Sequence, residues 1–137
     1  MESNNPPNFI TLDVEIVSDE DLTLLANYFE KSAFVLGNQQ VGDLYYLSLE
    51  PGWSDEEKTP ESCARFFVEA IATLPRELKE LWDRAKSRTF DFGFESGNVQ
   101  PYYRGEISQQ TLVKVVAVGA SVTITIYQLS SPEEGSA

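Results

Sequence analysis

The sequence predicts a single α+β domain, with helices on one face of a mixed or mostly antiparallel sheet and the element order βαββααβαβ. Several segments alternate apolar and polar residues, which is typical of half-buried strands. Other segments place apolar residues three and four positions apart behind capping residues, which indicates helices. The length of 137 residues fits one hydrophobic core.

The first half of the chain predicts one helix and three strands. Residues 10–16 alternate, with Ile10, Leu12, Val14 and Ile16 on the apolar side. Ser18, followed by three acidic residues, should cap a helix that buries apolar side chains between Leu22 and Phe29. Segments 33–36 and 44–49 then form a strand pair around a turn at 37–42.

The second half predicts three helices and two strands. Thr59-Pro60-Glu61 has a capping residue, a first-turn proline and an acid in the order that begins a helix. Pro75 should end that helix, and a second helix follows at 78–85. Segments 90–94 and 122–127 alternate as strands, and a helix capped by Ser108 and ended by Gly119 lies between them. We expect flexible tails at 1–8 and 130–137 around a domain at 9–129.

Composition excludes several classes of function. The chain has 22 Asp and Glu against 10 Lys and Arg, a net charge of −12, and no histidine. Histidine is the commonest general base and metal ligand, so most hydrolase and zinc sites are excluded. The negative charge disfavours nucleic acids and anionic membranes as partners. We predict a protein without catalytic residues, metal or cofactor.

The sequence also favours a cytoplasmic location. No apolar run approaches the roughly 20 residues that span a bilayer, and the first residues lack a basic and an apolar region. Cys63 is the single cysteine, so no disulfide can form within the chain. It lies among apolar helix positions, which predicts a buried and inert thiol.

The last third of the chain resembles a known family. The strand at 90–94, the capped helix from Ile107 to Ser121 and the strand at 122–127 are similar to the ending of a bacterial domain family of unknown function, numbered four thousand two hundred and seventy-nine. The resemblance implies a short bacterial domain and transfers no catalytic signature. In size and charge the chain is also similar to immunity proteins that neutralise secreted toxins.

One candidate site is the acidic segment 50–61. Asp55, Glu56 and Glu57 surround Trp53 there, and Tyr45 and Tyr46 precede it on the adjoining strand. Aromatic anchors ringed by polar groups are typical of protein interfaces, and negative charge speeds encounter with a basic partner. Alternatively, Trp53 packs onto the core and the acids are simply solvated.

A second candidate site is the polar face of the sheet. Asp13 and Glu15 project from the same side of the first strand, and Asp91 and Glu95 project from that side of a later one. These carboxylates could contact a partner or hold Mg²⁺, and the alternative is an ordinary solvated face.

Three functional hypotheses follow. The leading one is a non-catalytic acidic protein, of the immunity or antitoxin kind, that binds and blocks a basic toxin domain. The second is a structural or regulatory domain that forms a homodimer through a sheet edge or through its aromatic positions. The third is a Mg²⁺-dependent enzyme that uses Asp13, Glu15 and Asp91.

Overall fold

The computed structural model describes residues 4–53, 58–99 and 102–129. Within them the predicted fold class and element order are confirmed. The elements are β1 (Asn8–Ser18), α1 (Thr23–Phe29), β2 (Ala33–Val41), β3 (Leu44–Pro51), α2 (Pro60–Ala72), α3 (Arg76–Asp83), β4 (Ser87–Glu95), α4 (Gln109–Ala117) and β5 (Ser121–Tyr127).

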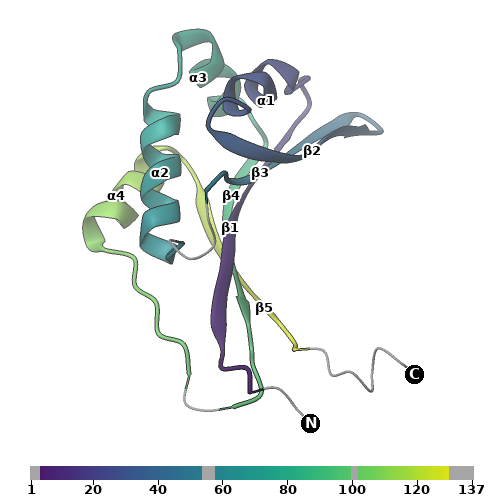
Figure 1. Ribbon diagram of the computed structural model, residues 1–137. Helices are drawn as coiled ribbons and strands as arrows, with labels where there is room; N and C mark the ends of the chain where they lie inside the picture. The colour runs from purple at the N-terminus through teal and green to yellow at the C-terminus, as the bar shows by residue number, and fades with distance from the viewer. Residues whose placement is uncertain (1–3, 54–57, 100–101, 130–137) are drawn as a thin grey trace.

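The five strands form one twisted sheet in the order β2-β3-β1-β4-β5. Neighbouring strands are antiparallel from β2 to β4, whereas β4 and β5 are parallel and are connected through α4. The helices gather on one side of the sheet (Figure 1). We call that side the inner face and the opposite side the outer face. β2 and β5 are the two edge strands.

The core lies between the inner face and the helices. Val14 on the central strand pairs with Leu49 on one side and Phe90 on the other, and all three side chains are fully buried. α2 contributes Phe67 and α3 contributes Trp82, which are also fully buried. The alternation of apolar residues therefore predicts the core correctly for a strand that has a neighbouring strand on each side and helices over its inner face.

Cys63 lies in this core, as predicted. Its side chain is fully buried in α2. Burial raises the pKa of the thiol to about 11. The reactive thiolate is therefore scarce at neutral pH.

The predicted beginnings of α2 and α4 are confirmed. Thr59 and Ser62 form a reciprocal capping box, and Pro60 occupies the first turn of α2. The hydroxyl of Ser108 accepts a hydrogen bond from the Thr111 N–H at the start of α4. Gly119 follows α4 with φ of 79°, a left-handed conformation that glycine adopts without strain.

The predicted start of α1 is wrong. Ser18 is the last residue of β1 and is buried, and the helix begins only at Thr23. The Ser18 hydroxyl accepts a hydrogen bond from the Glu20 N–H, and the Asp21 carboxylate accepts one from the Thr23 N–H. Both side chains thus form local turns that compete with helix at this point.

Two strand predictions also need correction. β2 continues through the segment predicted as a turn, and the chain reverses only at Gly42 and Asp43. Ile10, predicted to face the core, is 40% exposed because the pairing of β1 with β4 shifts register between Phe9 and Thr11. Such a bulge leaves one residue without a place in the inward alternation.

The first residues of β1 and the last residues of β5 lie at the lower end of the sheet, away from the helices (Figure 1). Asn8 is already part of β1, and the Asn5 N–H donates to the Asn98 side chain at 2.8 Å. Residues 1–3 and 130–137, predicted as tails, lie outside the described residues. None of the described helices is long and apolar enough to cross a membrane.

Candidate functional site

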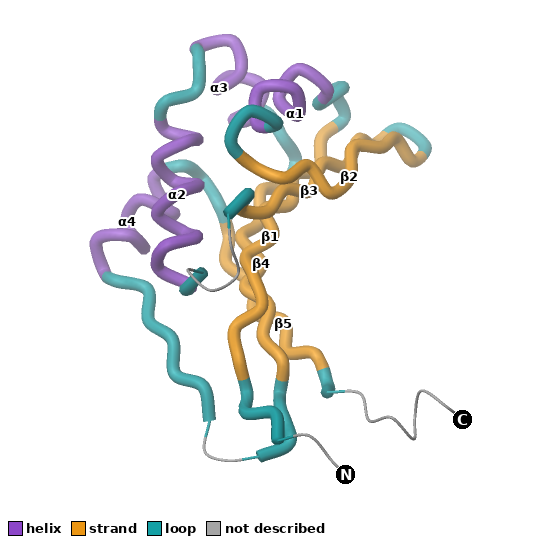
Figure 2. Tube along the Cα trace, viewed as in Figure 1, coloured by secondary structure: helices purple, strands orange, loops and turns teal. Residues whose placement is uncertain are grey.

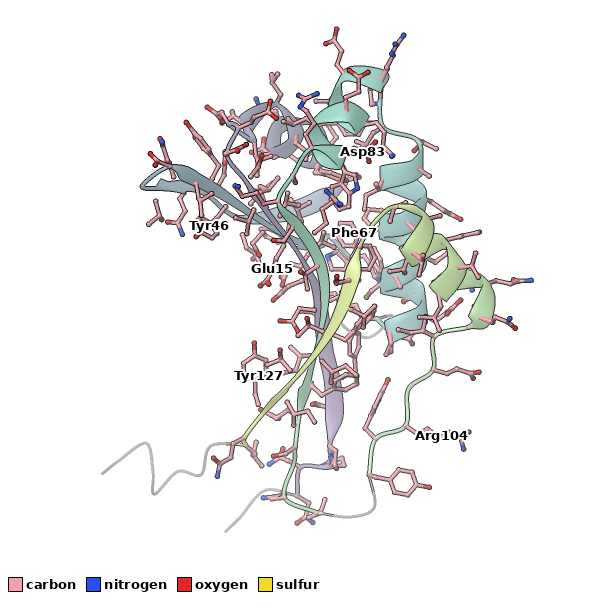
Figure 3. The ribbon with its side chains drawn as sticks, turned by 180° about the vertical axis from the view of Figure 1, so that it is seen from behind. Glu15, Tyr46, Phe67, Asp83, Arg104 and Tyr127 are labelled. Carbon is pink, nitrogen blue, oxygen red and sulfur yellow. The ribbon has the colours of Figure 1, made fainter. Side chains whose placement is uncertain are left out.

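Four carboxylates from three adjacent strands gather on the outer face. Asp13 on β1 pairs directly with Asp91 on β4, and Glu15 lies two residues further along β1. Glu50 joins them from β3, because it follows Leu49, the partner of Val14. We call Asp13, Glu15, Glu50 and Asp91 the carboxylate cluster. Figure 3 shows Glu15 on this face, on the opposite side of the sheet from Phe67.

Burial and like charges oppose ionisation within the cluster. Burial, together with the charges of Glu50, Glu15 and Asp91 and a hydrogen bond with Glu50, raises the pKa of Asp13 to about 7. Partial burial and the charge of Asp91 also raise the pKa of Glu15. Like charges held this close disfavour one another's ionisation. The hydroxyl of Thr125 on β5 donates to Asp91 at 2.7 Å, which satisfies one of these oxygens.

Cations of the described residues do not neutralise the cluster. The ion pairs among these residues involve Glu61, Glu80 and Asp83 on the helices, and Asp19 and Glu20 in the turn after β1. In addition, Asp13 Oδ1 is buried and has no hydrogen-bond partner in the described structure. Within the part of the chain that the structure describes, the cluster is therefore a concentration of negative charge that no ion pair compensates.

Exposed aromatic side chains border the cluster. Tyr46 lies on the outer face of β3 and lines, with Glu15, a shallow hollow of about 270 Å³ (Figure 3). Phe34 on β2 pairs with Glu50 and is 62% exposed. Tyr45, by contrast, is partly buried against the core. Of the two predicted tyrosines, therefore, Tyr46 is the one beside the carboxylates.

The acidic loop does not join this surface through Trp53. The Trp53 ring is partly buried and packs edge-on against Phe66 of α2, with ring centroids 5.0 Å apart. It therefore lies on the helix side of the sheet. Asp55, Glu56 and Glu57, the other predicted binding residues of this loop, lie outside the described residues.

The described carboxylates do not form a metal-binding arrangement. Asp13, Glu15 and Asp91 do share one face, as their positions in the strands predict. Across residues 4–53, 58–99 and 102–129, however, no three Asp, Glu or Cys side chains are placed to hold one metal ion together. The Mg²⁺ hypothesis has no support from this geometry.

A second candidate surface is an apolar groove along β5. The inner face of β4 and β5 forms its floor, through Phe94, Ile124 and Ile126, and Tyr102, Tyr103 and Gly105 form its wall. The groove has a volume of about 850 Å³ and continues into a smaller hollow of about 280 Å³ beneath Leu112 of α4. We call this the β5 groove. It exists because β1, β4 and β5 extend beyond the helices (Figure 2).

Two of these features escaped sequence reasoning. Glu50 was assigned to the acidic loop, although its spacing from Leu47 and Leu49 places it on the outer side of that strand. The β5 groove was missed because Val122, Ile124 and Ile126 alternate like core residues. In the structure they share the inner face but are 44%, 64% and 66% exposed.

Comparison of the chain with protein-family models, curated proteins and solved structures found no match. The carboxylate cluster and the β5 groove are therefore the features from which function is inferred.

Proposed function

We propose that this protein is a non-catalytic binding protein that captures a basic protein partner on its outer face, as an immunity or antitoxin protein blocks a toxin domain. The observation that carries the proposal is the carboxylate cluster, which none of the described ion pairs neutralises, in a chain of net charge −12.

A cation supplied by a partner would relieve the repulsion within the cluster. Its four acidic side chains come from three neighbouring strands, so their spacing is fixed by the sheet. A lysine or arginine placed among them favours the ionised forms and so lowers the raised pKa of Asp13. The long-range negative field would also speed encounter with a basic protein.

The aromatic border supports a protein partner. Interface energy concentrates in aromatic anchors that lie beside polar groups, and Tyr46 and Phe34 flank the cluster on the β3 and β2 side. Such a surface offers contacts to apolar side chains of the partner as well as to its cations. A protein of this kind would act in the cytoplasm, before its toxin is exported or after it enters.

Binding of a labelled oligo-arginine peptide, followed by fluorescence anisotropy at low salt, tests the surface. The double variant Glu15→Gln/Glu50→Gln should weaken binding by about tenfold or more, because two charges at the site are lost. Its control is Glu69→Gln/Glu77→Gln, which removes two exposed helix carboxylates and the same net charge. Equal weakening by both double variants would overturn the proposal of a specific face.

The immunity role has a separate test. A toxin and its immunity protein are encoded side by side, so the natural probe is the product of the adjacent gene. A complex at low salt that is lost in Glu15→Gln/Glu50→Gln supports the role, and the absence of any complex refutes it. Glu56→Lys/Glu57→Lys tests the acidic loop in the same assay, where slower association would assign that loop to the interface.

A further inference from the structure

We infer that two copies of this chain pair through their β5 strands, in antiparallel register about Ile124, to form one continuous ten-stranded sheet. The inference concerns the edge of the sheet and is independent of the partner proposed for the outer face.

β5 is an unprotected edge. Among the described residues only β4 pairs with it, and six of its seven residues are exposed. A strand edge with free N–H and C=O groups is a template for another strand, and proteins usually protect it with a charge, a proline or a bulge. β5 contains no charged residue and no proline, and its pairing with β4 runs without a register shift.

The other edge of the sheet is protected in this sense. β2 pairs with β3 through a register shift between Val35 and Gly37, so its backbone is irregular near the middle of the strand. A bulge twists an edge away from further pairing. The backbone of β2 is therefore less regular than that of β5 and less suited to pair with a further strand.

The sequence of β5 is complementary to itself. In an antiparallel pair centred on Ile124, each Val122 lies opposite an Ile126, and each Thr123 lies opposite a Thr125. Residues directly opposite one another project from the same face of the sheet, so all apolar side chains meet on the inner face and all threonines on the outer face. This symmetry is what a two-fold interface between identical chains requires.

The pairing would also extend the β5 groove. Ile124 and Ile126 form part of its floor, and Val122 lines the hollow beneath Leu112. The three side chains from each copy would form one apolar strip across the new junction. Burial of such side chains is the main favourable term in association.

The lack of charge on β5 favours a second copy of the chain at this edge over the basic partner proposed for the outer face. The strip is neutral, so it offers no attraction to cations and adds nothing to the general repulsion between two chains of net charge −12. The two Asp91 carboxylates would stand three strand spacings apart, roughly 14 Å. That exceeds the screening length of about 10 Å in moderate salt, so the clusters oppose pairing only weakly.

Sedimentation velocity of the full chain tests the inference. We expect the dimer fraction to increase over concentrations of about 1 to 100 μM, and to increase further with salt, because salt screens the repulsion between like-charged copies. A monomer at every concentration and salt level would overturn the inference.

Two matched variants locate the interface. Ile124→Glu places two like charges at the centre of the pair and should abolish the dimer. Val41→Glu, at a similarly exposed apolar position on the β2 edge, should leave it intact. Far-UV circular dichroism checks that both variants fold. A dimer that survives in Ile124→Glu would show that another surface is responsible.

A cross-linking experiment reports the register directly. In the proposed pair, position 124 faces its own copy at a Cα separation of about 4.5–5.5 Å, within the range of a disulfide. Ile124→Cys should therefore form a disulfide-linked dimer under mild oxidation, whereas Val41→Cys should not. Cys63 does not compete, because it is fully buried. Equal cross-linking of both variants would reject the register about Ile124.

Discussion

At the scale of single residues, Asp13 links the carboxylate cluster to stability. Its pKa is about 7 in the folded protein, against about 4 in an unfolded chain. Between these pH values the folded state keeps a proton that the unfolded state has released. The contribution of Asp13 therefore favours the folded state at about pH 4 and is lost as the pH rises through about 7.

Asp13→Asn removes this penalty while keeping the shape of the side chain. At pH 8 we expect the free energy of unfolding to increase by about 1–2 kcal/mol, the equivalent of one pKa unit or slightly more after solvent screening. At pH 5 the gain should be smaller, because the native carboxyl is then protonated. Urea denaturation at both pH values measures this. Asp43→Asn, in the exposed turn between β2 and β3, is the control, and a loss of stability in Asp13→Asn at pH 8 would contradict the prediction.

Glu61 has the opposite character, since it stabilises the fold in its ionised form. Partial burial alone would raise its pKa, but hydrogen bonds from the Ser108 N–H, Arg65, and the hydroxyls of Thr111 and Ser108 lower it to about 2. The Ser108 N–H donates to the Glu61 carboxylate at 2.8 Å, and the Thr111 hydroxyl donates to it at 2.7 Å. One carboxylate therefore joins the first turns of α2 and α4.

Glu61→Gln should reduce the free energy of unfolding by about 1–3 kcal/mol at pH 7, because hydrogen bonds to a charge are lost. The difference from the unsubstituted protein should shrink as the pH falls from about 4.5 toward 2, where the native carboxylate becomes protonated. Thermal unfolding across this range gives the comparison. Glu106→Gln, in the exposed connection before α4, should have little effect, and a deficit independent of pH would point to packing instead of charge.

At the scale of elements, the ends of α3 and α4 depend on one arginine. Arg88 on β4 donates to the Gly119 carbonyl after α4 and to the carbonyls of Trp82, Asp83 and Ala85 at the end of α3. The last carbonyls of a helix lack the regular partner four residues on, and the Trp82 carbonyl accepts the Ala85 N–H as well as the guanidinium. The guanidinium thus binds two helix C-termini to the sheet at once.

Arg88→Lys keeps the charge but not the planar set of donors. A single ammonium cannot reach both helix ends, so we expect a loss of about 1–3 kcal/mol in the free energy of unfolding. Urea denaturation measures it, and Arg104→Lys, in the exposed connection before α4, is the control. If both variants are equally stable, the carbonyls are satisfied without Arg88.

The elements also show which local patterns could be read from the sequence. Thr59, Ser108 and Gly119 mark helix boundaries correctly, because capping depends on residues close by in the chain. Ser18 failed as a marker, because a serine bonds its neighbouring N–H equally well in a turn. Local chemistry therefore predicts the presence of α1 but not the residue at which it begins.

At the scale of the whole molecule, strand order determines whether the apolar residues of an alternating segment are buried or exposed. Val14 and Ile124 occupy similar alternating segments, yet Val14 is fully buried on the central strand and Ile124 is exposed on an edge. Glu50 joins the carboxylate cluster because β3 lies beside β1. Both facts depend on pairing between distant segments, which periodicity alone does not reveal.

The arrangement of the whole molecule predicts that its two surfaces act separately. The carboxylate cluster lies on the outer face, whereas the pairing strip lies along the β5 edge and the inner face. Glu15→Gln/Glu50→Gln should weaken binding of the oligo-arginine peptide and leave the dimer unchanged. Ile124→Glu should remove the dimer and leave peptide binding unchanged.

An increase in salt concentration should change peptide binding and dimer formation in opposite directions. Peptide binding joins opposite charges and should weaken as salt increases, whereas pairing joins two chains of like charge and should strengthen. Anisotropy and sedimentation velocity at matched salt concentrations measure both in each variant. If Ile124→Glu also abolished peptide binding, the peptide would require the dimer, and the outer face of one chain would not be sufficient as a binding site.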